Sequence, residues 1–197
     1  EYLHRSIPNC LHQTLKDIEI ICVKDGSTDN TAEILQEYAN KDNRIKIITQ
    51  ENQGTLVARK RGMEHAIGEY CMFLDQDDFY ELYACQELYQ WIEQQKVDMV
   101  DCRYNIIEQD NTVHNWSLSS LAYQKLNSLE ALEKIVDNRS NFHSVIYIWK
   151  KILSHTLYKK VASHIPIKHM ISNEDIFIGT LCFYFAKTFY AVDNIYY

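Results

Sequence analysis

The fold depends on the stretch Ile18-Glu19-Ile20-Ile21-Cys22-Val23-Lys24-Asp25-Gly26-Ser27. Its β-branched residues and short length are typical of a buried strand, and the Asp-Gly pair marks the turn that follows. Helical periodicity then continues over residues 32–39, with Asp29 or Asn30 available as the N-cap. A strand that leads through a turn into a helix is the repeating unit of an α/β fold.

The same alternation continues along the first half of the chain. A helix is predicted ahead of the first strand, with Leu3, Ile7 and Leu11 at helical spacing. Further strands are predicted over 44–49, 69–74 and 97–103, and helices over 55–67 and 81–95. We therefore expect an α/β sandwich around a mostly parallel sheet.

The second half is less regular. We expect a polar hairpin or loop over 105–116, a capped helix over 128–136, a strand over 145–149, a helix over 174–187 and a strand over 189–197. No internal repeat and no convincing linker interrupts the chain. We predict one domain over residues 1–197, with one half over 1–103 and the other over 104–197.

Composition excludes several classes of protein. The 197 residues carry a net charge of −7, with 46% hydrophobic and 24% charged residues, as in an ordinary globular domain. The acidic balance disfavours a nucleic-acid-binding protein, which needs clustered Lys and Arg. No apolar run reaches the ~18 residues of a membrane-spanning helix. The six cysteines form no C-x-x-C pair and mostly lie in apolar runs, so we expect free thiols in a reducing compartment.

Three carboxylates within four residues form the first candidate site. They lie in Phe73-Leu74-Asp75-Gln76-Asp77-Asp78, after a predicted strand, where open α/β sheets bind ligands. A hard cation such as Mg²⁺ or Mn²⁺, bridging to substrate phosphates, would relieve their mutual repulsion. The alternative is a solvated turn in which Asp78 caps the next helix. An EF-hand is excluded because Tyr80 and Gln86 replace its Gly and Glu.

Three further segments are weaker candidates. Residues 23–31 join a strand to a helix, and Asp25 could accept hydrogen bonds from a base or ribose, although an ordinary Asp-Gly turn explains the same pattern. The basic run 58–62 could contact a nucleotide or simply form an exposed helical face. The acidic start of the last helix, 173–175, is explained by the helix dipole alone.

Taken together, these segments resemble family 2 glycosyltransferases. Residues 9–15, 19–31, 52–54, 58–59 and 68–78 match the family's motifs in order and spacing. Weaker similarity extends to 149–153, 173–175 and 195–197. Several motifs in one order are far more specific than any one of them.

The resemblance implies a GT-A fold, a Rossmann-like three-layer sandwich in which 1–103 binds a nucleotide-sugar and 104–197 lies on the acceptor side. It also implies an inverting transfer that depends on Mn²⁺ or Mg²⁺. The residues that match the family's site are Asp25, Arg59, Asp75 and Asp77 for the donor, Asp77 and Asp78 for the metal, and Asp175 as the catalytic base.

Some positions depart from the family. Lys24 stands where a further Asp is usual, and Lys60 where Asn is common. The family's first strand is expected just before Glu1, so we expect this chain to be a fragment of a longer one. No Q-x-x-R-W signature of processive synthases follows Asp175, which favours transfer of a single sugar.

The expected function is transfer from a nucleoside-diphosphate sugar, most simply a UDP-sugar, to a saccharide or lipid-linked saccharide. We expect this at the cytoplasmic face of a membrane, with peripheral association through segments outside this chain. Two alternatives remain at this point. One is a catalytically silent module that binds nucleotide-sugar, and the other is a phosphotransferase that uses Asp75 or Asp77 as its nucleophile.

Overall fold

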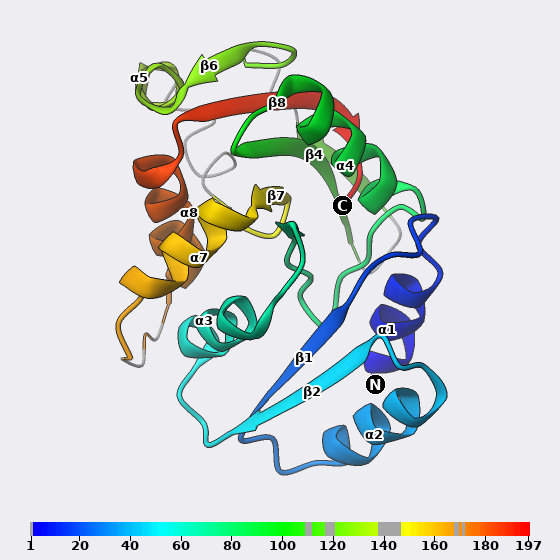
Figure 1. Cartoon of the computed structure of the whole chain (residues 1–197). Helices are drawn as coiled ribbons and strands as arrows, with labels where there is room; N and C mark the ends of the chain where they lie inside the picture. The colour runs from blue at the N-terminus through cyan, green and yellow to red at the C-terminus, as the bar shows by residue number, and fades with distance from the viewer. Residues whose placement is uncertain (1, 109–111, 117–120, 138–146, 168–169, 171) are drawn as a thin grey trace.

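The computed structural model of the protein describes residues 2–108, 112–116, 121–137, 147–167, 170 and 172–197. The described strands form two sheets, one of two strands and one of six (Figure 1). The first half supplies α1 (Leu3–Leu11), β1 (Ile20–Asp25), α2 (Thr31–Lys41), β2 (Ile45–Gln50), α3 (Thr55–His65), β3 (Tyr70–Cys71) and α4 (Ala84–Gln95). Then follow β4 (Met99–Ile107), β5 (Val113–Trp116), β6 (Lys125–Asn127), α5 (Ser128–Asp137), β7 (Lys151–Ser154), α7 (His155–His164), α8 (Glu174–Phe185) and β8 (Thr188–Ile195).

The small sheet is a parallel pair. β1 and β2 run from the Ile20–Ile45 pairing to the Asp25–Gln50 pairing, joined by the crossover helix α2. Helices α1 and α2 cover one face and α3 the other (Figure 1). A cluster of Ile7, Leu35 and Ile45 binds the first layer together. Helices on both faces of parallel strands are the arrangement that βαβ connections produce.

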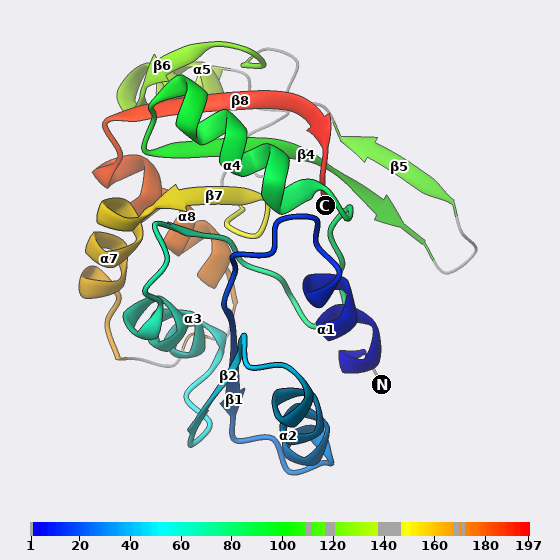
Figure 2. The ribbon, with the colours of Figure 1, turned by 45° about the vertical axis from the view of Figure 1, so that its right-hand side comes forward.

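The large sheet has the strand order β3-β7-β4-β8-β6, with β5 paired to β4. Helix α4 covers one face, where Leu88, Val100 and Tyr190 belong to one apolar cluster. Helices α7 and α8 lie on the opposite side (Figure 2), where Tyr158 and Phe183 belong to a second cluster that includes α3. The large sheet therefore lies between two layers of helices, which is the three-layer arrangement that was predicted.

Most predicted elements are present, with shifted ends, and the α/β class is as predicted. The sheet is more mixed than predicted: β1–β2 and β4–β8 are parallel, whereas β3–β7, β4–β7, β4–β5 and β6–β8 are antiparallel. Of these pairs, only β1–β2 joins two consecutive strands through a crossover helix, the connection that makes neighbouring strands parallel.

The prediction of a strand over 145–149 is wrong for its described part. Residues 145 and 146 lie outside the described residues, and 147–150 form a bend and a turn. The strand comes two residues later, as β7, and helix α7 follows without having been predicted. The predicted 105–116 hairpin is confirmed where described, because β4 extends to Ile107 and pairs with β5.

All six cysteines are free thiols, as predicted. Burial raises the pKa of the Cys102 and Cys182 thiols to about 12, so neither is a reactive thiolate at neutral pH.

Among the described helices, none combines the length and hydropathy needed to span a bilayer.

A buried charge cluster joins β4 to the start of β7. Asp101 accepts hydrogen bonds from Lys150, at 2.8 Å, and from Lys151, at 2.9 Å, and the three side chains are fully buried. Burial lowers the pKa of Lys150 to about 8. One carboxylate thus accepts hydrogen bonds from two ammonium groups, and removing one partner of a buried ion pair is strongly destabilising.

We expect Asp101→Asn to lower the free energy of unfolding by about 3–5 kcal/mol, because it removes the buried carboxylate charge that pairs with both lysines. Urea unfolding followed by tryptophan fluorescence measures this. The control is Glu37→Gln, which removes the exposed Glu37–Lys41 pair and should leave the midpoint almost unchanged. Equal midpoints for wild type and Asp101→Asn would contradict the role given to the cluster.

Candidate functional site

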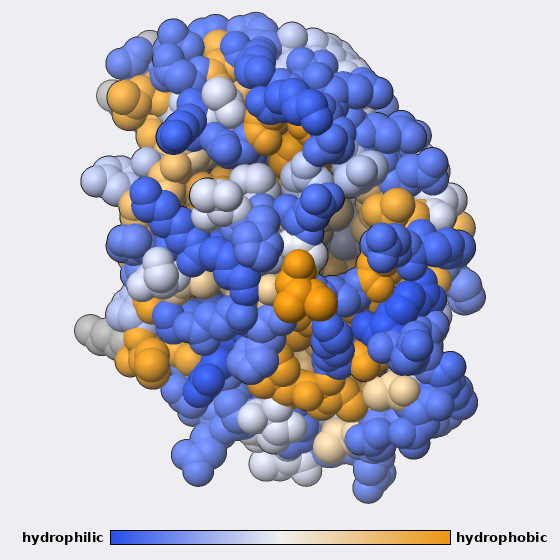
Figure 3. Space-filling view, viewed as in Figure 1, coloured by the Kyte–Doolittle hydropathy of each residue, from blue (hydrophilic) through white to orange (hydrophobic). Residues whose placement is uncertain are grey.

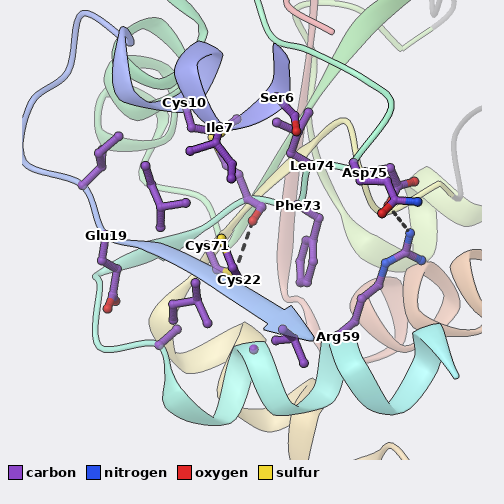
Figure 4. Close-up of a pocket in the computed structure, with 18 of the residues that line it drawn as sticks. Ser6, Ile7, Cys10, Glu19, Cys22, Arg59, Cys71, Phe73, Leu74 and Asp75 are labelled. Atoms are coloured by element: carbon purple, nitrogen blue, oxygen red, sulfur yellow. Dashed lines mark hydrogen bonds and ion pairs between the residues drawn. The ribbon is translucent and has the colours of Figure 1, made fainter. Parts of the chain in front are cut away.

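The predicted site residues gather at one edge of the molecule. Asp25 ends β1, Asp75 follows β3, and Asp175 lies in the first turn of α8. Arg59 points from α3 toward Asp75 (Figure 4). The edge is therefore built from the carboxyl ends of strands in both sheets and from two helices, as expected for a ligand site in an open α/β fold.

Asp25 organises the loop between β2 and α3. Its carboxylate accepts hydrogen bonds from the backbone N–H groups of Gln53 and Gly54 and from the side chain of Gln50, each at 2.8 Å. A carboxylate offers about four acceptor positions, so a further donor can still be accommodated. Asp25 is thus a structural residue of the edge, whatever it contacts in a ligand.

Arg59 links three segments of the chain. Its side chain is 8% exposed and pairs with Asp75 at 2.7 Å. It also donates to Asp175 and lies 3.6 Å from Glu174. The planar guanidinium carries five N–H donors, which allows it to serve two carboxylates at once. Asp75 and Asp175, a hundred residues apart in sequence, are brought together by this one cation.

The three aspartates of the acidic turn have different surroundings. Asp75 is paired with Arg59, Asp77 is exposed, and Asp78 is half-buried. Burial, with the nearby charges of Asp77 and Asp75, raises the pKa of Asp78, although a hydrogen bond from Tyr197 opposes the rise. Negative charge is therefore concentrated at Asp77 and Asp78, with Arg5 as a nearby cation.

These carboxylates fit a hard divalent cation in one particular mode. Among the described residues, no three His, Cys, Asp or Glu side chains are grouped closely enough to hold a metal by themselves. Mg²⁺ is commonly held by one or two carboxylates together with substrate phosphates. The oxygen chemistry of Asp77 and Asp78 matches that mode.

Two residues of this edge were not predicted as site residues. Tyr197 donates to the Asp78 carboxylate at 2.5 Å, and Arg5 on α1 donates to the backbone carbonyl of Asp77. The closing Ile195-Tyr196-Tyr197 resembled the family, which was the available signal for Tyr197. Nothing in the sequence around Arg5 indicated its contact.

The basic side chains of the run 58–62 make different contacts. Arg59 enters the site, whereas Lys60 donates to the Ala162 carbonyl at 2.7 Å and so ties α3 to α7. Arg61 is exposed. The run is therefore not a simple exposed face.

An acidic edge bridged by Arg59 thus lies at the carboxyl ends of strands in an α/β protein, with helices on both faces of its sheets. The family model described as "Glycosyl transferase family 2" matches residues 1–161. The chain therefore belongs to glycosyltransferase family 2, as the motif resemblance predicted.

Curated relatives carry glycosyltransferase names. Cholesterol galactosyltransferase of Borreliella burgdorferi is 30% identical over 203 residues, which cover 100% of this chain and 56% of the relative. Glycosyltransferase GlyA of Streptococcus pneumoniae is 31% identical over 163 residues, 81% of this chain and 23% of the relative. The chain therefore spans about half or less of the length of these relatives.

Solved structures support the fold. S. aureus TarS 1-349 in complex with UDP-GlcNAc aligns with a TM-score of 0.80 and 21% identity, over 100% of this chain and 54% of that chain. The same protein in complex with UDP aligns with a TM-score of 0.79. The GT-A α/β class predicted from the sequence is thereby confirmed.

We expect Gly26→Ala to destabilise the site loop. Gly26 has φ +69°, and an added Cβ would lie 2.7 Å from the Asn52 Cβ and backbone N. A left-handed non-glycine residue costs about 1–3 kcal/mol, before the clash is counted. Thermal unfolding measures the loss.

The matched control is Gly62→Ala. Gly62 lies within α3, where a Cβ would meet only the Val23 Cγ2 atom, at an ordinary 3.7 Å. This change should stabilise the protein by roughly 0.5–1 kcal/mol, because alanine favours a helix over glycine. Equal Tm values for the two variants would show that the turn at Gly26 is not constrained as described.

Proposed function

We propose that this chain forms the donor- and acceptor-binding domain of an inverting, metal-dependent, non-processive glycosyltransferase. Its donor is a UDP-sugar, its metal Mn²⁺ or Mg²⁺, and its acceptor a saccharide or lipid-linked saccharide at the cytoplasmic face of a membrane. The observation that carries the proposal is the Arg59 bridge, which holds together Asp75, proposed for the donor, and Asp175, proposed as the base. Family membership and the UDP-GlcNAc complex of TarS support it.

The donor would lie along the edge between Asp25 and Asp78. Asp25 would accept a hydrogen bond from the base or ribose, and the buried Arg59 guanidinium would face the diphosphate. Asp77 and Asp78 would hold the divalent ion. When bound, that ion would supply Lewis-acid stabilisation of the charge that develops on the leaving diphosphate.

Asp175 would act as the general base. Its carboxylate takes the proton of the acceptor hydroxyl as that oxygen bonds to the anomeric carbon. The bond from this carbon to the diphosphate oxygen breaks on the opposite face, so the configuration inverts. The nucleoside diphosphate leaves with the electron pair. In this scheme Asp175 exchanges its hydrogen bond from Arg59 for one from the acceptor.

The direct test is a thermal-shift screen of nucleoside-diphosphate sugars with Mn²⁺. A donor at a hundredfold excess over its Kd stabilises the folded state by about 2.7 kcal/mol, which is a readily measured shift. We expect UDP-sugars to shift Tm only when Mn²⁺ or Mg²⁺ is present. In Asp77→Asn and Asp78→Asn the shift should largely disappear, and an unchanged shift in both would remove the assigned metal site.

Asp175→Asn should separate binding from chemistry. We expect donor binding close to wild type and turnover lower by roughly 10²–10⁴-fold, the usual contribution of a general base. Glu174→Gln is the control, because Glu174 lies beside Asp175 and only 3.6 Å from Arg59. Wild-type turnover in Asp175→Asn would show that another residue is the base.

Arg59→Lys keeps the positive charge but cannot bridge two carboxylates in a fork. We expect it to weaken donor binding and lower kcat/KM by about tenfold or more. Arg61→Lys, on the same helix but exposed, should behave as wild type. Equal kinetics for the two variants would contradict the bridging role.

The same measurements decide between this proposal and its alternatives. Binding of UDP with Mn²⁺ but no transfer or hydrolysis across the donor panel would favour a silent binding module. An aspartyl-phosphate trapped on Asp75 or Asp77 would favour a phosphotransferase.

A further inference from the structure

Tyr197 contacts the acidic turn from a distant part of the sequence. Its hydroxyl donates a hydrogen bond of 2.5 Å to Oδ2 of Asp78, which lies 119 residues earlier. Hydrogen bonds to an ionised carboxylate are roughly twice as strong as those between neutral groups. A carboxylate has about four acceptor positions, so this bond leaves positions on Asp78 for a further ligand.

The aromatic ring of Tyr197 is held on two sides. The Tyr80 ring meets it edge-on, with centroids 5.3 Å apart and planes at 79°. The Trp149 ring packs against it with centroids 4.5 Å apart and planes at 32°. The Tyr197 carbonyl also accepts a hydrogen bond from the N–H of Asn105 on β4, at 3.0 Å. Ring packing and the backbone therefore fix the direction in which the hydroxyl reaches Asp78.

The backbone around the acidic turn is held separately. Asn9 on α1 pairs with the backbone of Tyr80, accepting from its N–H at 2.9 Å and donating to its carbonyl at 2.8 Å. The Tyr80 hydroxyl donates to the Phe73 carbonyl at 2.5 Å. These contacts hold the chain before and after Asp78, whereas the bond from Tyr197 orients the carboxylate itself.

The contact between Tyr197 and Asp78 is within reach of solvent. Both residues are partly exposed, and Asp77 beside them is exposed. The surface is hollowed near the position at which Figure 1 marks the C-terminus (Figure 3). A dissolved ion can therefore reach this carboxylate, and Tyr197 lies at the border of the candidate site rather than within a closed core.

Carboxylates that hold metal ions in proteins are themselves usually hydrogen-bonded. Such a hydrogen bond keeps the carboxylate in the orientation that the ion needs, and loss of the donor typically lowers metal affinity by roughly 10–100-fold. A phenol suits this position because it donates a hydrogen bond while remaining neutral at physiological pH. It therefore orients the carboxylate without bringing a positive charge that would repel the ion.

We propose that Tyr197 is a positioning residue for the divalent ion, and that its hydroxyl orients Asp78 and so raises the affinity of the site for Mn²⁺ or Mg²⁺. This inference rests on the proposed function, since it requires Asp78 to be a metal ligand. Tyr197 acts through Asp78. The effect belongs to the hydroxyl and not to the ring, so the removal of one oxygen atom separates the two.

The test uses Tyr197→Phe, which removes the hydroxyl and keeps a ring between Tyr80 and Trp149. The matched control is Tyr196→Phe, because the Tyr196 hydroxyl also donates to a carboxylate at 2.5 Å, that of Glu87 on α4. Binding of Mn²⁺ in the presence of UDP is titrated through the electron paramagnetic resonance signal of the free ion. This measurement requires no turnover.

We expect Tyr197→Phe to raise the Kd for Mn²⁺ by about tenfold or more, and Tyr196→Phe to leave it at the wild-type value. The metal-free Tm of both variants should fall by similar small amounts, because each loses one hydrogen bond to a carboxylate. With a sugar donor, Tyr197→Phe should need about tenfold more Mn²⁺ for its half-maximal rate, while kcat at saturating Mn²⁺ stays near wild type.

The outcomes separate this inference from the proposed function. Equal Kd values in a wild type that binds Mn²⁺ and in Tyr197→Phe would overturn the inference and leave the proposed function standing. Tighter binding in Tyr197→Phe would overturn it as well, since the hydroxyl would then compete with the ion. Equal losses in both variants would assign the effect to general loosening. Absence of Mn²⁺ binding by the wild-type chain would remove the proposed metal site, and this inference with it.

Discussion

The edge of the molecule that carries the candidate site depends on the pairing of Arg59 with carboxylates from two distant segments. Asp75 lies 16 residues and Asp175 116 residues from Arg59 in sequence. A guanidinium that is nearly buried has to be paired, because an isolated charge in that place would be strongly destabilising. The pairing therefore fixes α3, the acidic turn and the start of α8 relative to one another, and any ligand at this edge meets a preassembled set of charges.

The apolar cores explain how this arrangement is held. Helix α3 buries Leu56 and Met63 in the cluster that α7 and α8 share, so the helix carrying Arg59 rests on the helix carrying Asp175. Lys60 adds a direct hydrogen bond to α7. By contrast, β1 pairs with β2 and packs against helices, but it does not pair with β3.

The candidate site was largely predictable because strand ends are visible in sequence. Asp25 and the acidic turn 75–78 each follow an apolar run, and parallel strands that end at one edge bring such residues together. The different contacts that these aspartates make were less predictable. Asp25 accepts hydrogen bonds from the loop 50–54, and Asp78 is contacted by Tyr197, because loops and the chain's last strand fold back onto the edge.

The sequence by itself determined the order of elements through Arg103, the free cysteines and the family, since these follow from local periodicity, turn chemistry and the spacing of motifs. Only the tertiary structure decided that Arg59 bridges Asp75 and Asp175 and that β7 starts at Lys151 in an antiparallel pair. These features are set by contacts between residues far apart in the chain, and no local pattern records which distant partner a strand edge or a buried charge will meet.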